Sequence, residues 1–120
     1  MKSGPLTPEF LDEHLHEDVT FYSPVVFTPQ VGKPLTTAYL LAAGQTLGGS
    51  DEQPFRYTKE IVGDRNAMLE FETSIGGKYV NGVDIITVDN EGLITEFKVL
   101  IRPLQGVNAI HEAMMAALQR

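Results

Sequence analysis

The chain has 120 residues, of which 9 are basic and 16 are acidic, for a formal net charge of −7. Its hydrophobic fraction of 42% and charged fraction of 21% are typical of a globular protein. The absence of cysteine excludes disulfide bonds and thiolate metal sites. The acidic balance disfavours nucleic acid and anionic membranes as partners, because binding to phosphates depends on Lys and Arg.

We expect one domain over residues 1–120, with a loose N-terminus at residues 1–6. No apolar run approaches the roughly 18 residues of a membrane span. The N-terminus also lacks the apolar segment of a signal peptide. The expectation is therefore a cytoplasmic protein.

Two helices and a strand are predicted in the first half of the chain. A short helix is expected over about residues 8–17, because Thr7 suits the N-cap and Pro8 suits the first helical position. Residues 19–23 have the composition of a strand. A second helix, rich in Leu and Ala, is expected over residues 35–47.

The second half of the chain has the pattern of strands. Residues 55–62 and 67–75 form one predicted hairpin, and residues 79–102 form another around the turn-forming cluster at residues 89–92. After Pro103, apolar residues recur at helical spacing and predict a terminal helix. This order indicates an α+β fold, in which helices cover one face of a curved antiparallel sheet and the early strand joins its edge.

Asp84 lies in the middle of an apolar strand, and the hairpin turns predict which way it points. A two-residue turn at residues 76–77 places Asp84 opposite Leu69, and a loop at residues 89–92 places it opposite Phe97. Both registers predict one apolar face that collects Leu69, Phe71, Gly82, Asp84, Ile86, Phe97, Val99 and Ile101. The opposite face collects Glu70, Glu72, Asn81, Glu96, Lys98 and Arg102.

A carboxylate on an apolar face raises its pKa, finds a hydrogen-bond donor or lines a wet cavity. Each outcome makes Asp84 a candidate general acid or base, or a neutral acid that donates a hydrogen bond. The alternative is a register shifted by one residue, which turns Asp84 outward beside Lys98 or Glu96.

The order of elements, with the segments HEDVTFYSP (residues 16–24) and GVDII…DNEGLITEF (residues 82–97), resembles the nuclear transport factor 2-like superfamily. Within it, the chain is most similar to the SnoaL-like and ketosteroid-isomerase-like branch. The resemblance implies a cone-shaped fold that encloses an apolar pocket, often in a homodimer packed through the sheets. Val83, Ile85 and Leu100 lie on the outer face where such packing is expected.

The resemblance also implies roles for single residues. Asp84 falls where the isomerases keep an aspartic acid that hydrogen-bonds the substrate oxyanion. Ser23 falls where they have their general-base aspartate, and the first helix has no equivalent of their oxyanion tyrosine. A hydroxyl without an adjacent base does not shuttle protons between carbons, which disfavours steroid-type isomerisation.

The resemblance therefore implies a SnoaL-like protein that binds a small apolar molecule bearing a carbonyl or hydroxyl group. Asp84 is the pocket acid and the catalytic candidate, with isomerase, cyclase or hydrolase activity left open. The alternative is a non-catalytic dimeric domain with a vestigial pocket. No cofactor is predicted, and no metal site, because the histidines are not clustered with other ligands.

The predicted ligand contacts are Ser23, Tyr39, Leu69, Phe71, Phe97, Val99, Ile101 and His14. Tyr39 lies on the helix expected to cover the cavity mouth. His14 lies on the apolar stripe of the first helix, where packing between helices is the alternative role. Glu60 becomes a second pocket carboxylate, accompanied by Arg56 and Thr58, if the loop before the next strand has four residues. The alternate set, Phe55, Tyr57 and Ile61, instead has the character of core.

Overall fold

The structure, a computed structural model, describes residues 7–118. Its elements are α1 (Pro8–His14), β1 (Leu15–Tyr22), β2 (Gln30–Val31), α2 (Lys33–Thr46), β3 (Arg56–Val62), β4 (Asn66–Ile75), β5 (Lys78–Val88), β6 (Ile94–Arg102) and α3 (Leu104–Leu118). The loose N-terminus expected at residues 1–6 lies outside the described residues. No helix within residues 7–118 is long and apolar enough to cross a membrane.

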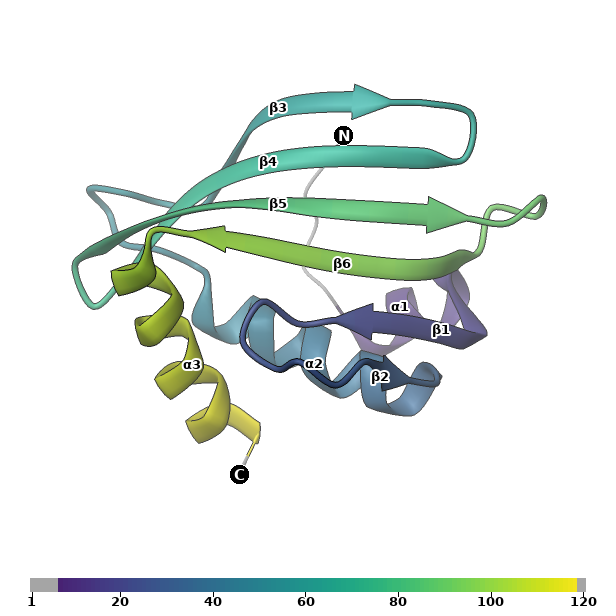
Figure 1. The fold of residues 1–120 in the computed structure, drawn as a ribbon, viewed down its shortest axis with the longest axis horizontal. Helices are drawn as coiled ribbons and strands as arrows, with labels where there is room; N and C mark the ends of the chain where they lie inside the picture. The colour runs from purple at the N-terminus through teal and green to yellow at the C-terminus, as the bar shows by residue number, and fades with distance from the viewer. Residues whose placement is uncertain (1–6, 119–120) are drawn as a thin grey trace.

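Six strands form one curved sheet in the order β2-β1-β6-β5-β4-β3, with the helices on one side of it (Figure 1). The four strands from β3 to β6 are an antiparallel meander. The early strand β1 joins this meander as a parallel neighbour of β6, and the short β2 continues the sheet beyond it. The predicted α+β fold with a curved, helix-covered sheet is confirmed.

Helix α1 begins where the sequence predicts and ends earlier. The Thr7 side chain accepts a hydrogen bond from the Phe10 N–H at 3.1 Å, which caps the first turn. The helix ends at His14 rather than at residue 17, because Leu15 adopts an extended conformation. Leu15 is 1% exposed and pairs with Ile94 of β6, so sheet pairing and burial determine its conformation.

The buried apolar side chains form two clusters between the sheet and the helices. The first contains Leu11, Leu15, Val19, Phe21 and Leu40, and the second contains Ala42, Phe71, Val80, Ile110 and Met114. Each cluster therefore joins side chains of the sheet to side chains of two helices. Both clusters also contribute side chains to the cavity described below.

The observed strand registers place Asp84 on the apolar face. Asp84 pairs with Leu69 on β4, as the turn at residues 76–77 predicts. On β6 it pairs with Val99, and the predicted pairing with Phe97 is wrong. Val88 pairs with Ile94, one residue beyond the pairing that the loop predicts, and an irregularity between the pairs of Thr87 and Val88 adds one more residue, so Asp84 is displaced by two residues from the prediction. A displacement of two residues leaves every side chain on its predicted face.

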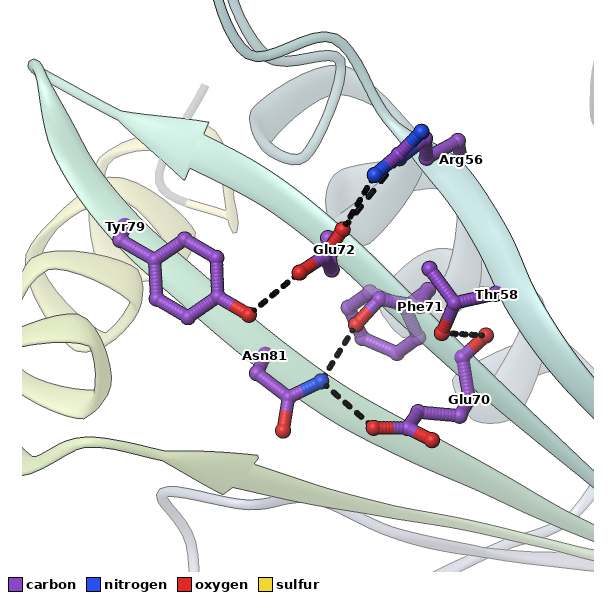
Figure 2. A network of polar contacts seen from close by, with 7 residues as sticks. All are labelled: Arg56, Thr58, Glu70, Phe71, Glu72, Tyr79 and Asn81. Carbon is purple, nitrogen blue, oxygen red and sulfur yellow. Dashed lines mark hydrogen bonds and ion pairs between the residues drawn. The ribbon is translucent and has the colours of Figure 1, made fainter.

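The opposite face of the sheet carries the polar side chains that the alternation predicts (Figure 2). Arg56 forms an ion pair with Glu72 at 3.0 Å, and the Tyr79 hydroxyl donates a hydrogen bond to the same carboxylate at 2.7 Å. The Asn81 amide donates to Glu70 at 3.1 Å. This network connects β3, β4 and β5 on the side of the sheet that faces away from the cavity.

Candidate functional site

A cavity of about 590 Å³ lies between the curved sheet and the three helices. Its walls are mostly aliphatic and aromatic, with contributions from Phe10, Leu11, Phe21, Pro24, Leu40, Ala43, Gly44, Leu47, Gly48, Phe55, Leu69, Phe71, Ile86, Ile94, Phe97, Val99, Ile101, Ile110 and Met114. The polar side chains in the lining are Ser23, Tyr57 and Asp84. Of residues 7–118, those that line the cavity include no Lys, Arg or His.

Asp84 is 8% exposed and lies on β5 between Leu69 of β4 and Val99 of β6. Burial among these apolar neighbours disfavours the carboxylate and raises the pKa of Asp84 to about 7. A hydrogen bond from the Tyr57 side chain opposes this increase, because it stabilises the charged form. Asp84 is therefore close to half protonated near neutral pH.

Tyr57 is the hydrogen-bond partner of this carboxyl group. It lies on β3, partly buried, and reaches across β4 to the Asp84 side chain. Burial raises the pKa of Tyr57 to about 12, and the charge and hydrogen bond of Asp84 act in the same direction, followed by the charge of Glu60. The phenol therefore stays protonated at neutral pH and remains a donor.

A β-bulge at Thr58 brings Tyr57 to the cavity. Tyr57 pairs with Phe71 and Glu60 pairs with Leu69, so both lie on the cavity side of the sheet although they are three positions apart. Regular alternation without a bulge places Tyr57 and Glu60 on opposite faces of the sheet. Nothing in the local sequence marks the bulge. Tyr57 is therefore a site residue that the sequence pattern does not predict.

Because of the bulge, the prediction that Arg56 and Thr58 share a face with Glu60 is wrong. Arg56 does not share the face of Glu60 but points to the outer face and pairs with Glu72. Thr58 is the bulged residue, and its hydroxyl donates to the Glu70 carbonyl at 3.4 Å. Ile61 is not core but is 57% exposed. Glu60 itself is exposed and is not among the residues that line the cavity.

The structure brings most of the predicted ligand contacts together in the cavity wall. These residues are Ser23, Leu69, Phe71, Phe97, Val99 and Ile101, which line the cavity with Asp84. The Ser23 hydroxyl accepts a hydrogen bond from the Val25 N–H at 3.1 Å, so its oxygen is partly used within its own loop. The role of these residues in ligand binding stays a prediction.

Tyr39 and His14 are placed elsewhere. Tyr39 packs against the ring of Phe21, with ring centroids 5.6 Å apart, and is not among the lining residues. His14 stacks on Phe10 at 4.1 Å, and its Nδ1 lies 2.7 Å from the Phe10 carbonyl oxygen, so these contacts lie within α1 rather than between helices. Among residues 7–118, no three His, Asp or Glu side chains are grouped to hold a metal ion.

Gly82 shapes the wall beside Asp84. A Cβ at this position would lie 2.4 Å from the Phe71 ring and 2.7 Å from Ile101, far closer than van der Waals contact allows. The missing side chain therefore lets the Phe71 ring lie over β5. Phe71 in turn stacks on Phe55 at 5.0 Å, and Phe55 meets Tyr57 edge to face at 5.1 Å. These three rings form an aromatic wall that reaches Asp84 through Tyr57.

A curved sheet and helices around an apolar cavity, whose described lining includes the buried carboxyl of Asp84, define a cone-shaped α+β protein. Solved structures share this fold. A steroid delta-isomerase from Pseudomonas aeruginosa is 29% identical, with a TM-score of 0.86, and the match covers 93% of this chain and 80% of that chain. An uncharacterized bacterial protein with a cystatin-like fold, from Silicibacter pomeroyi DSS-3, is 33% identical, with a TM-score of 0.82 and coverage of 91% and 74%.

A more distant match shows the fold alone. An NTF2-like protein of unknown function from Mesorhizobium loti is 18% identical, with a TM-score of 0.67 and coverage of 80% of this chain and 78% of that chain. No protein-family model matches the chain, and no curated protein matches it. The predicted resemblance to the nuclear transport factor 2-like superfamily is confirmed at the level of the fold, and the chain is also similar in sequence to a steroid delta-isomerase.

Proposed function

We propose that this protein binds a small apolar molecule bearing a carbonyl or hydroxyl group, and that Asp84 is the acid that hydrogen-bonds its oxygen. The observation that carries the proposal is the buried Asp84 carboxyl in the wall of a cavity of about 590 Å³. Ligand cavities in proteins occupy about 300 to 1,000 Å³ and combine apolar walls with a few polar groups. The cavity fits this description.

The chemistry follows from the protonation of Asp84. With its pKa raised to about 7 by burial, Asp84 is a neutral acid in a large fraction of molecules at neutral pH. A neutral carboxylic acid can donate a hydrogen bond to a carbonyl oxygen, and this bond strengthens as negative charge develops on that oxygen. Such stabilisation serves reactions that pass through an enol or enolate, which include isomerisations and cyclisations.

Ser23 limits the reaction. The similarity to a steroid delta-isomerase supports isomerase-type chemistry. However, the resemblance puts Ser23 where the isomerases have their general-base aspartate, and within residues 7–118 the cavity lining holds one carboxylate, that of Asp84. A reaction that needs a second protein base to carry a proton between two carbons is therefore disfavoured.

Binding of 1-acetylnaphthalene at pH 6, followed by fluorescence or calorimetry, tests the proposal. We expect saturable 1:1 binding that Asp84→Ala weakens about 5- to 13-fold, since a hydrogen bond to a carbonyl in an apolar site is worth about 1 to 1.5 kcal/mol. Asp84→Asn keeps a donor and should bind with affinity close to that of the wild type. Equal binding by wild type and Asp84→Ala would contradict the role of Asp84.

A second candidate is a non-catalytic domain that acts through a homodimer packed on the outer face of the sheet. The single carboxylate in the lining favours it, as does an apolar centre on that face formed by Val83, Ile85, Met68 and Leu100, of which Leu100 is 51% exposed. Light scattering at micromolar concentration should give about twice the chain mass of 13.2 kDa, and Leu100→Lys should give the monomer. A monomeric wild type would remove the dimer.

A further inference from the structure

We propose that the same cavity is also a site for lipophilic amines, which bind as ammonium ions against the carboxylate form of Asp84. The inference rests on the cavity being a ligand site, as the proposed function has it. It concerns a ligand class that requires the charged form of Asp84 rather than the neutral form. Its basis is a buried acid, set in a wall of aromatic rings, that no Lys, Arg or His among the described cavity-lining residues faces.

Among residues 7–118, the groups around Asp84 supply no positive charge. On β3, Tyr57 donates a hydrogen bond to the carboxylate, and the charge of Glu60 acts on Tyr57. Across the strands, Asp84 faces Leu69 on β4 and Val99 on β6. The remaining elements contribute to the cavity the apolar residues Phe10 and Leu11 of α1, Phe21 of β1, Leu40, Ala43, Gly44 and Leu47 of α2 and Ile110 and Met114 of α3, with Ser23 the uncharged polar group.

This arrangement differs from an ordinary structural ion pair. A buried carboxylate is normally compensated by a Lys or Arg, because an unpaired buried charge is costly. Here the Asp84 carboxylate is compensated by the Tyr57 hydroxyl, which carries no charge. The negative charge of the carboxylate is therefore available to attract a positively charged ligand. The formal net charge of −7 on the chain also favours the approach of a cation over that of an anion.

The aromatic wall suits an ammonium group as well. Phe55, Tyr57 and Phe71 are in mutual contact, with ring centroids 5.0 and 5.1 Å apart, and all three line the cavity. The faces of such rings attract cations, most strongly where water is excluded. The apolar frame of the amine would fill the rest of the cavity, so that one ligand satisfies both the carboxylate and the walls.

The state of Asp84 at mildly alkaline pH supports the ion pair. Burial raises the pKa of Asp84 to about 7, so at pH 8 most molecules already hold the carboxylate. An incoming ammonium ion then meets a charge that is already desolvated. A neutral ketone has the opposite requirement, because it needs the protonated acid as donor.

Two probes with one carbon frame separate these cases: 1-(1-naphthyl)ethylamine, which is protonated from pH 6 to 8, and 1-acetylnaphthalene. With a pKa of about 7, the carboxylate fraction of Asp84 rises about 10-fold between pH 6 and pH 8. The dissociation constant of the amine should therefore fall by up to about 10-fold over this range, whereas that of the ketone should rise. Carbon-13 NMR should show that bound amine lowers the pKa of the Asp84 carboxyl.

Asp84→Asn should abolish amine binding and its pH dependence. Glu96→Gln, which removes an exposed acid on the outer face, is the matched control and should change neither. Amine binding that is independent of pH, or that survives in Asp84→Asn, overturns this inference. The proposed function is then tested by ketone binding alone. Ketone failure with pH-dependent amine binding overturns the proposed function alone. Absence of binding by both probes overturns both proposals, and this wild-type comparison requires no variant to fold.

Discussion

Replacement of Asp84 by asparagine is expected to change how stability depends on pH. Burial raises the pKa of Asp84 to about 7 from its ordinary value of 3.8, so the folded protein keeps a proton that the unfolded chain has already lost over this interval. A raised carboxyl pKa stabilises the fold fully below the unfolded value. That stability is lost as the pH rises toward 7.

The size of this loss follows from the pKa difference. About 3 pH units, at 1.36 kcal/mol each, give about 4 kcal/mol of stability lost by the wild type between pH 4 and pH 8 through this one group. Asparagine does not titrate and can still accept the Tyr57 hydrogen bond. The free energy of unfolding of Asp84→Asn, relative to wild type, should therefore rise by about 4 kcal/mol over the same range.

Urea unfolding of both proteins at pH 4, 6 and 8 measures this difference. Glu96→Gln provides the comparison for removal of an acidic group at an exposed position. The reasoning is refuted if wild type and Asp84→Asn show parallel stability profiles, because Asp84 would then titrate in the folded protein as it does in the unfolded chain. A profile of opposite slope would mean that the carboxylate is stabilised by a cation.

Three further substitutions test the surroundings of the site. Tyr57→Phe removes a hydrogen bond to a charged group, worth about 1.5 to 3 kcal/mol, and should raise the Asp84 pKa by about one to two pH units in a carbon-13 NMR titration. Gly82→Ala places a Cβ against the Phe71 ring and should lower the free energy of unfolding by about 1 to 3 kcal/mol in urea. Thr36→Val removes a fully buried hydroxyl with no partner among the described residues. It should raise the free energy of unfolding by about 1 kcal/mol, and with it the melting temperature.

Each of these substitutions has a matched control. Tyr22→Phe changes a phenol whose ring lies under Lys98, away from the cavity lining, and should leave the Asp84 pKa unchanged. Gly63→Ala adds a Cβ at an ordinary 3.6 Å contact and should change stability by less than about 0.5 kcal/mol. Thr28→Val, at an exposed site, should not stabilise. An Asp84 pKa that stays constant in Tyr57→Phe, a neutral Gly82→Ala or a destabilised Thr36→Val would contradict the corresponding argument.

The face of Asp84 was predictable from the sequence although one of its strand pairings was not. The turn at residues 76–77 has two glycines, and its length sets the pairing of Asp84 with Leu69. The loop before β6 is less regular, since Gly92 has a positive φ and the ladder is interrupted between Thr87 and Val88. The loop displaces the pairing of Val88 by one residue, and the interruption of the ladder displaces the pairs beyond it by one more. Because a strand alternates with a period of two, Asp84 stays on its predicted face.

The partner of Asp84 was not predictable from the same reasoning. Tyr57 and Glu60 lie at odd separation, and regular alternation assigns them to opposite faces. The bulge at Thr58 removes this exclusion, and its position depends on pairing with β4 rather than on the residues of β3 themselves. Chemical features that depend on alternation are recoverable from sequence, whereas those that depend on an inserted residue require the structure.

The bulge at Thr58 has a second consequence for the molecule. Strand β3 is the last strand on its side of the sheet, and a regular edge strand is a template on which another chain can add by backbone pairing. The bulge disrupts the regular spacing of its free backbone groups, and Arg56, Lys59 and Glu60 place exposed charges along the same strand. The irregularity that brings a phenol to the buried acid therefore also protects the sheet against edge-to-edge aggregation.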